Sequence, residues 1–311
     1  MLRLLLGVVC GVIGITVLAV YALPREMPRQ NYITIDEGMG IAEIAATLDA
    51  ADVVYSKLLT QTLIIFRGGE RSVQAGMYAF SDRANAWDVT TRLLNGDLGI
   101  DPIVVRVPEG ATRVEMAMLF EAELPFVTAD EFLTLSDEME GYLFPDTYYF
   151  VPTDTAERVI DRLRDTFDTK TADLRSRVEA SGQTFDDIVI IGSLIEGEVA
   201  DPDDRRLVSG VIQNRLAIDM ALQLDASFAF LLGKESAELT RDDLSYESPY
   251  NTYLYPGLPP GPIGSPSLDA MEAAFAPTPS DYFYYLSASD GTTYFAEDFE
   301  GHKANRARYL D

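Results

Sequence analysis

The stretch IIGSLIEGEV, residues 190–199, decides how the rest of the sequence is interpreted. It is apolar as far as Ile195 and then carries two carboxylates, Glu196 and Glu198. An apolar run of this length, preceded by Asp186 and Asp187, is typical of a buried helix with acids in its first turn. We therefore expect a helix from about Asp186 to Ala200 with two acids at its carboxyl end.

These two acids are expected to point in different directions. Side chains two residues apart on a helix diverge by roughly 200°, so Glu196 and Glu198 cannot both face one cleft. Glu196 shares its face with Gly192 and Ser193, whose small side chains leave room for a ligand, whereas Glu198 follows the apolar stripe. A carboxyl group against apolar walls has a raised pKa, which suits a general acid. A solvated helix end is the alternative interpretation of the same pattern.

Downstream stretches add side chains that suit a polysaccharide. Residues 213–216 (QNRL) and 220–225 (MALQLD) place amides and a carboxylate around one helix end, and amides bind N-acetyl groups and sugar hydroxyls. Residues 248–253 (SPYNTY) set two tyrosines and an amide in a loop. Residues 257–263 (GLPPGPI) form a second loop, which its prolines make rigid.

Composition excludes several classes of function. Fifty acidic residues against 24 basic ones give a net charge of −26, and a surface this acidic repels phosphate, so nucleic-acid binding is not expected. The one cysteine, Cys10, lies in an apolar stretch, so there is neither an intrachain disulfide nor an exposed thiol nucleophile. Because His302 is the only histidine, a zinc site built on two or three histidines is excluded, and a Ser-His-Asp triad would have to use His302 as its base. Carboxylates remain for acid–base chemistry.

The amino-terminal segment is predicted to cross a membrane. Residues 4–24 carry no charge, and twenty-one residues at ~1.5 Å each span roughly 30 Å, the thickness of the hydrocarbon core. We expect an uncleaved anchor at residues 1–24, followed by a polar stalk at residues 25–31. A cleaved signal peptide is the rival interpretation, with residues 20–22 as a small-residue cleavage site.

Two strand–turn–helix patterns recur about 72 residues apart. In the first, the alternating strand signal at residues 32–35 is followed by Gly38 and by apolar residues at helical spacing from Ile41 to Leu48. The second runs from residue 104 to residue 119 and turns at Gly110. They are either independent junctions or a glycan-holding module of the LysM type. We also expect a strand at 75–80, a helix at 87–94, a charged helix at 153–182 and a hairpin around Gly291.

Six motifs in this order resemble the YceG-like family of endolytic murein transglycosylases. They are EGYLFPDTY at residues 140–148, SLIEGE at 193–198, NRL at 214–216, LQLD at 222–225, YNTY at 250–253 and GLPPG at 257–261. The resemblance implies an α+β protein with an N-terminal transmembrane helix, a LysM-like subdomain at residues 32–100 and a mixed α/β catalytic domain at 101–311. It also implies a single-pass bacterial inner-membrane protein that faces the periplasm and meets peptidoglycan synthases.

The resemblance further implies a reaction. The glycosidic bond between MurNAc and GlcNAc in nascent peptidoglycan glycan strands would be cleaved with a 1,6-anhydro end as product, without a metal or organic cofactor. The catalytic acid is carried over to Glu196, which matches the first acid of the family segment. The predicted substrate-binding residues are Asn214, Gln223, Asp225, Tyr250, Asn251 and Tyr253.

The sequence departs from the family pattern at several positions, and two other functions stay open. Gly197 replaces the usual Lys, Ala226 and Ser227 replace Pro and Thr, and Thr293 stands where a histidine is common. One alternative is a hydrolase that pairs Glu196 with Asp225 or Glu140. The other is a non-catalytic protein that binds the cell wall through residues 31–120.

Overall fold

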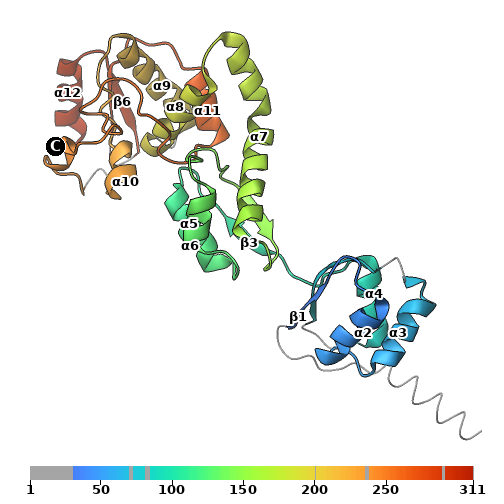
Figure 1. Cartoon of the computed structure of the whole chain (residues 1–311). Coiled ribbons are helices and arrows are strands. Elements are labelled where there is room, and N and C mark those ends of the chain that lie inside the picture. Colours follow the sequence, from blue (N-terminus) through green and yellow to red (C-terminus); the bar gives the residue numbers. More distant parts are fainter. Residues whose placement is uncertain are drawn as a thin grey trace, which may run out of the picture. The chain divides into compact units, whose positions relative to one another are not determined.

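The computed structural model describes residues 31–69, 73–80, 85–199, 201–234, 238–288 and 291–310. The chain divides into two compact units between Pro102 and Ile103 (Figure 1). Helices combine with antiparallel two-stranded sheets, so the organisation is α+β as predicted. Within the described ranges, no helix is both long and apolar enough to cross a membrane. The predicted anchor at residues 1–24 and the stalk as far as residue 30 lie outside those ranges.

In the first unit, two helices separate two paired strands along the sequence, and a third helix follows. Its elements are β1 (Asn31–Ile35), α2 (Ile41–Ala50), α3 (Lys57–Phe66), β2 (Gly76–Phe80) and α4 (Ala86–Asn95). β1 and β2 are antiparallel, with Ile33 opposite Tyr78. The strand, the apolar helix that follows it, the second strand and the helix before Gly96 are all confirmed, whereas α3 was not predicted.

Local signals in this unit fix where its elements begin and end. Gly38 turns the chain between β1 and α2 at φ 83°, and Gly96 ends α4 at φ 68°, conformations that residues with a Cβ rarely adopt. Asn85 and Asp88 form a capping box at the start of α4. Ser56 caps the unpredicted α3 through a side-chain bond to the Leu59 amide.

The second unit contains the candidate site. Its elements are β3 (Ile103–Arg106), α5 (Arg113–Glu123), α6 (Ala129–Leu135), β4 (Thr147–Phe150), α7 (Ala156–Ser181), α8 (Phe185–Glu198), α9 (Pro202–Ala217), α10 (Ala226–Leu232), the 3-10 turn η3 (Asp243–Ser245), α11 (Leu268–Phe275), β5 (Tyr284–Ser287), β6 (Thr293–Ala296) and α12 (Phe299–Tyr309). β3 pairs with β4 and β5 with β6, each antiparallel, and the second pair confirms the predicted hairpin.

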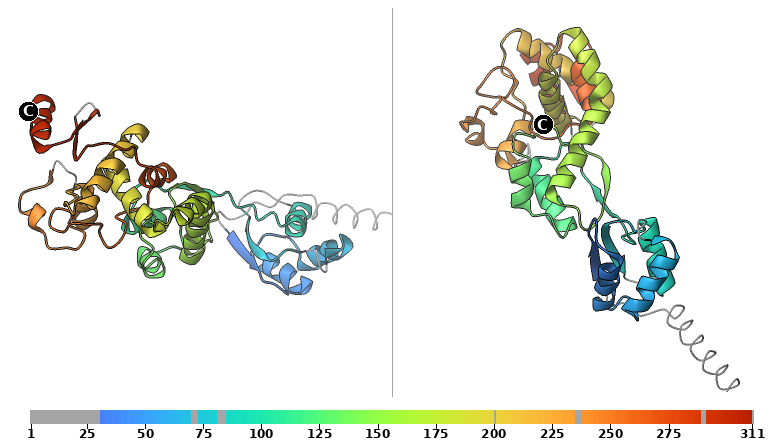
Figure 2. Two further views of the ribbon diagram at one scale, coloured as in Figure 1. Left: turned by 90° about the horizontal axis from the view of Figure 1, so that it is seen from above. Right: turned by 45° about the vertical axis from the view of Figure 1, so that its right-hand side comes forward.

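The long helix α7 joins two hydrophobic cores of this unit. Val159 and Leu163 pack in the core of β3, β4, α5 and α6, whereas Phe167 and Val178 pack in the core of α8, α9 and α11. This stripe confirms the predicted charged helix with one apolar face. Gly182 ends it at φ 81°. Figure 2 shows α12 beside the β5–β6 hairpin, at the edge of the second core.

Candidate active site

The last turn of α8 carries Glu196 and Glu198 into different surroundings. The helix ends at Glu198, and both acids lie where apolar packing stops. As predicted from their spacing, the two carboxylates face in different directions, because each bonds a different set of elements. The sequence suggested space for a ligand beside Glu196 rather than beside Glu198, and the structure shows the reverse.

Glu196 lies in an enclosed ion pair. Its Oε1 accepts a bond from Arg205 Nη2 at 2.6 Å, and the two side chains are only 6% and 8% exposed, respectively. Its Oε2 accepts the Ser267 backbone N–H at 3.0 Å and the Ser267 hydroxyl. Arg205 also donates to the Val199 carbonyl at 3.1 Å. Both oxygens of the Glu196 carboxylate are therefore occupied by donors of the protein itself, which leaves neither free to meet a glycosidic oxygen.

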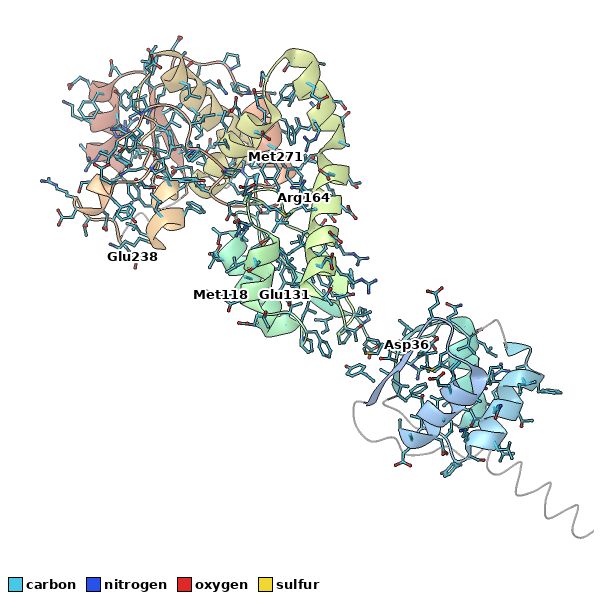
Figure 3. All side chains as sticks on the ribbon, in the orientation of Figure 1. Asp36, Met118, Glu131, Arg164, Glu238 and Met271 are labelled. Atoms are coloured by element: carbon cyan, nitrogen blue, oxygen red, sulfur yellow. The ribbon has the colours of Figure 1, made fainter. Side chains whose placement is uncertain are left out.

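The small-residue face beside Glu196 packs helices together and holds no ligand space. A Cβ on Gly192 would lie 3.3 Å from the Cα of Met271, a residue of α11 that is labelled in Figure 3, and α11 packs directly on α8. The Ser193 hydroxyl donates to the Ile190 carbonyl at 2.7 Å and accepts the Ile263 amide at 3.1 Å. The prediction that this face opens to a substrate was therefore wrong, because close backbone approach uses the room.

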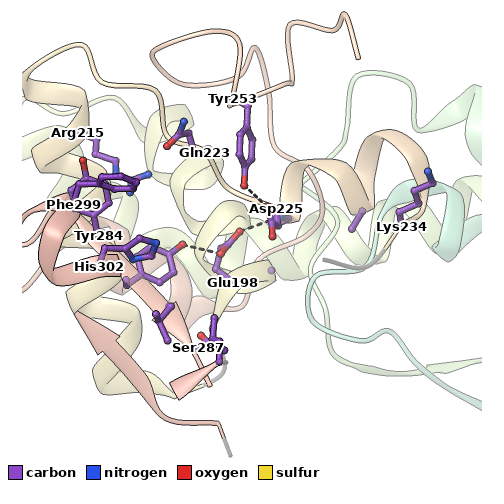
Figure 4. Close-up of a pocket in the computed structure, with 16 residues that line it drawn as sticks. Glu198, Arg215, Gln223, Asp225, Lys234, Tyr253, Tyr284, Ser287, Phe299 and His302 are labelled. Atoms are coloured by element: carbon purple, nitrogen blue, oxygen red, sulfur yellow. Dashed lines mark hydrogen bonds between the residues drawn. The ribbon is translucent and has the colours of Figure 1, made fainter. Parts of the chain in front are cut away.

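Glu198 instead faces a cavity of about 540 Å³ (Figure 4). Its Oε1 accepts the Ala226 backbone N–H at 3.0 Å and its Oε2 accepts the Tyr285 hydroxyl at 2.8 Å. The residues that line the cavity come from α8, α9, α10, the 223–225 and 253 loops, β5 and α12. They are Gly197, Glu198, Arg215, Gln223, Asp225, Ala226, Ala229, Lys234, Tyr253, Tyr284, Tyr285, Leu286, Ser287, Phe299, His302 and Leu310. Glu196 is not among these described lining residues.

The surroundings of Glu198 favour its protonated form. Burial raises the pKa of this carboxyl above its ordinary value of 4.5, and the nearby Asp225 charge raises it further. The Ala226 amide, the Tyr285 hydroxyl and the charge of Arg215 act in the opposite direction and do not cancel the effect of burial. A carboxyl group that lines a cavity and has a raised pKa is suited to act as a proton donor.

Three of the predicted substrate-binding residues line the same cavity. Asp225 Oδ1 accepts the Tyr253 hydroxyl at 2.5 Å, and burial together with this carboxylate raises the pKa of Tyr253. Gln223 has a left-handed backbone (φ 50°) and donates its N–H to the Thr252 carbonyl at 2.9 Å. Figure 4 shows Gln223 and Tyr253 on the same side of Glu198. A strained non-glycine backbone at a cavity wall is common at functional sites.

The two predicted asparagines hold backbone and do not line the cavity. Asn214 Nδ2 donates to the carbonyls of Ser280 and Tyr282 at 2.8 and 2.9 Å. Asn251 is fully buried, and its Nδ2 donates to the carbonyls of Leu244 and Tyr246 at 3.1 and 2.8 Å. The amide nitrogens of both side chains are occupied by the protein, so the structure gives them a loop-holding role, and their contact with substrate stays a prediction.

Tyr250 and Glu140 also lie away from this cavity. The Tyr250 ring packs on Phe230, with centroids 5.0 Å apart. Glu140 accepts the Arg113 backbone N–H at 3.2 Å, at the first residue of α5. Burial raises the pKa of Glu140 to about 7, and the Arg113 amide only partly opposes this. Neither is among the described residues that line the cavity. Glu140, which the sequence analysis paired with Glu196 in the hydrolase alternative, is therefore not a second carboxylate in the cavity of Glu198.

Sequence reasoning assigned no site role to most of the residues that line the cavity, among them Arg215, Tyr284, Tyr285 and His302. Arg215 is buried, donates its Nε to the Phe283 carbonyl at 2.7 Å and lies over the Tyr284 ring. His302 packs on Tyr284, and burial and nearby arginines lower its pKa, so its imidazole is neutral at neutral pH. Tyr285 bonds Glu198. The NRL motif and the lone histidine were the available signals, whereas nothing local marked the tyrosines of β5.

No candidate metal centre occurs in the described ranges. Among those residues, no group of three or more His, Cys, Asp or Glu side chains lies close enough together to hold a metal ion.

Comparisons with known proteins find the same family that the six motifs resemble. Residues 33–308 match the model of the YceG-like family. An endolytic murein transglycosylase of Streptococcus pneumoniae (serotype 2, strain D39) is 29% identical in an alignment that covers 93% of this chain. An endolytic murein transglycosylase of Bacillus subtilis (strain 168) is 28% identical in an alignment that covers 89% of this chain. The chain spans 60% of the length of the Streptococcus relative and 84% of the Bacillus relative.

A solved structure has a similar fold. The crystal structure of a yceG-like protein from Listeria monocytogenes aligns with a TM-score of 0.62 at 28% sequence identity. The alignment covers 89% of this chain and 99% of the Listeria chain, so the likeness extends over most of both.

Proposed function

The chain belongs to the YceG-like family, and on that premise we propose that it is an endolytic murein transglycosylase. It would cleave the bond between MurNAc and GlcNAc within peptidoglycan strands and leave a 1,6-anhydro-MurNAc end. The observation that carries the proposal is the cavity of Glu198, a carboxyl group with a raised pKa among amide, carboxylate and tyrosine side chains. The names of the Streptococcus and Bacillus relatives support the same reaction.

We assign the general acid to Glu198 in place of Glu196. Glu198 would donate its proton to the glycosidic oxygen as the bond to C1 of MurNAc breaks and positive charge develops on the sugar ring. The resulting carboxylate would then take the proton of the C6 hydroxyl, whose oxygen attacks C1 and closes the anhydro ring. No water is consumed, and the carboxyl group returns to its starting state. One carboxyl group in two protonation states is sufficient for this sequence.

The other cavity side chains have roles in this scheme. The Ala226 amide and Tyr285 hydroxyl support the carboxylate that forms after proton donation. Gln223 and Tyr253 lie where they can hold the N-acetyl and hydroxyl groups of the sugar. The Asp225 carboxylate, next to Glu198, suits the positive charge that develops on the ring.

A hydrolase is the second candidate, because Asp225 gives the cavity a second carboxylate. Two carboxyl groups that flank a glycosidic bond can hydrolyse it through a covalent intermediate or an activated water. The product distinguishes the two reactions, since hydrolysis leaves a reducing end that is one water heavier than the anhydro end. The rate of either depends on Glu198.

The first unit and the amino-terminal segment have supporting roles in the proposal. Between β1 and β2 the chain forms two helices, an arrangement that suits a LysM-like module. A cavity of about 900 Å³ next to the β1–α2 turn could hold a glycan. The uncharged run at residues 4–24 would anchor the chain in the inner membrane, with both units on the periplasmic side.

Glu198→Gln is expected to abolish cleavage and leave the fold intact. Gln keeps the size and the bond from Ala226 but can neither deliver nor take up a proton, so the contribution of proton transfer, about 10²–10⁴-fold, is lost and no product is expected within the assay. The matched control is Glu196→Gln, two residues away. It breaks an enclosed ion pair and should lower the free energy of unfolding by about 3 kcal/mol while keeping measurable cleavage below its melting temperature.

Mass spectrometry of muropeptides released from purified sacculi, with melting curves of both variants, tests this pair. Anhydro products from the wild type and the Glu196 variant, and none from the Glu198 variant, support the assignment. Normal cleavage by Glu198→Gln, together with an inactive but normally folded Glu196→Gln, would show that Glu196 is the general acid. Reducing-end products alone would support the hydrolase.

The pH dependence of cleavage should report the Glu198 proton. The acid must be protonated, so kcat/KM falls as pH rises through its pKa. The Tyr285 hydroxyl stabilises the carboxylate, so Tyr285→Phe raises the pKa further and should move the falling limb to higher pH by about 1 unit. Tyr284→Phe is the control, since it removes a cavity hydroxyl without a described bond to Glu198. An unmoved limb in Tyr285→Phe would contradict the assignment.

Membrane attachment is tested by alkaline carbonate extraction of membranes that contain the full chain with a carboxyl-terminal tag. The uncharged run predicts that the full-length protein stays in the pellet. Recovery of most of it in the supernatant would contradict an uncleaved anchor.

Glycan binding by the first unit is tested at Gln61, a polar residue that lines its cavity from α3. In the full-length Glu198→Gln chain, adding Gln61→Ala should weaken retention on insoluble peptidoglycan severalfold, because a direct polar contact is lost. Unchanged retention would argue that this cavity does not hold glycan.

A further inference from the structure

The loop that presents Tyr253 also lines a second cavity. Its volume is about 520 Å³, and it is lined by Glu247, Ser248, Pro249, Tyr255, Leu258 and Pro260. Tyr253 lines the Glu198 cavity, and Tyr255 lines this one. Since consecutive Cα atoms are 3.8 Å apart, the two tyrosines' Cα atoms are at most about 7.6 Å apart. The residue 246–260 loop therefore contributes to both cavities.

We propose that this second cavity is a saccharide subsite that takes an N-acetylhexosamine unit of the same glycan strand, with the Tyr255 ring as its platform. The inference rests on the proposed function, since it assigns further binding of the same substrate. An enzyme that cuts within a strand must hold sugar units beyond the pair that reacts. The shared loop places a second binding surface within reach of the first.

The lining fits the chemistry of an N-acetylated sugar. Tyr255 is 45% exposed, and an exposed aromatic ring offers a flat apolar face to the C–H groups of a pyranose. Leu258 and Pro260 supply an apolar wall for the methyl of an N-acetyl group. Glu247 and Ser248 supply oxygens for sugar hydroxyls, and no cation is among the described lining residues. A neutral, partly apolar ligand suits this surface better than an anion does.

The platform is held in place before a ligand arrives. The Tyr255 hydroxyl donates to Glu247 Oε2 at 2.7 Å, which fixes the ring against the start of the loop. Asn251 is fully buried and donates to the carbonyls of Leu244 in η3 and of Tyr246 in the loop, and the Thr252 hydroxyl accepts the Leu224 amide at 2.9 Å. A surface fixed in this way loses little conformational entropy when a sugar binds. The buried Asn251, which was predicted to bind substrate, would thus serve recognition through the loop that it holds.

The test measures binding of the tetramer of N-acetylglucosamine to the full-length Glu198→Gln chain by calorimetric titration. Glu198→Gln prevents turnover, so binding is read without cleavage. Adding Tyr255→Ala should weaken the affinity about tenfold, which corresponds to about 1.4 kcal/mol. Tyr255→Phe keeps the ring and should retain most of the affinity. Tyr149→Ala is the matched control, because Tyr149 is 59% exposed in the same unit and lines neither cavity.

The outcomes separate this inference from the proposed function. Equal affinity in Tyr255→Ala and its parent, with unchanged melting temperatures, overturns the subsite, and so does an absence of tetramer binding to the parent. Loss of binding in Tyr255→Ala alone supports the subsite, even where the wild type yields no anhydro product and the proposed reaction fails. Anhydro products from the wild type, with binding that is indifferent to Tyr255, leave the reaction in place and remove the subsite.

Discussion

The enclosed ion pair between Glu196 and Arg205 is the constraint on which the site depends. Glu196 is on α8, Arg205 is on α9, and Ser267, the N-cap of α11, donates twice to the same carboxylate. Burying two charges carries a large desolvation cost, which is offset only when geometry and additional hydrogen bonds are good. Here the bonds join three helices at the last turn of α8. Glu198 is two residues further along that turn, so this network also fixes where Glu198 points.

Small residues allow the helices and loops around this network to come close. A Cβ on Gly210 would lie 2.6 Å from the Thr278 carbonyl oxygen, and one on Gly264 would lie 2.2 Å from the Gly110 carbonyl oxygen. Gly110 in turn lies beside Glu196, since its Cβ would be 3.6 Å from Glu196 Cγ. The contacts of Gly210 and Gly264 involve backbone atoms, which cannot move aside as a flexible side chain can. In this unit glycine therefore marks close packing more often than an opening for substrate.

The sequence predicted elements better than it predicted the site, for physical reasons. Periodicity and end signals located α7, α8 and the β5–β6 hairpin, since these depend on neighbouring residues. It also showed that Glu196 and Glu198 diverge. It could not show which acid lines the cavity, because that depends on Arg205 and Tyr285, one on the next helix and one 87 residues away from Glu198. The Asn251 amide could hydrogen-bond a sugar as far as its sequence shows. Only its burial reveals that it bonds backbone carbonyls of the protein instead.

Two positions at which the sequence analysis found a departure from the family pattern that the chain resembles, Gly197 and Ala226, lie beside Glu198. A Cβ on Gly197 would lie 2.7 Å from the Cβ of Ala226, so the longer side chain usual at position 197 would displace the start of α10. Ala226 stands where the pattern has Pro, and Pro has no N–H to donate. In this chain the Ala226 N–H bonds Glu198 Oε1 at 3.0 Å and lowers the pKa that burial raises. Gly197 thus lets α10 approach, and Ala226 uses the approach to place a donor on the carboxylate. The two replacements act together, and they moderate the pKa of the proposed acid without removing it from the cavity.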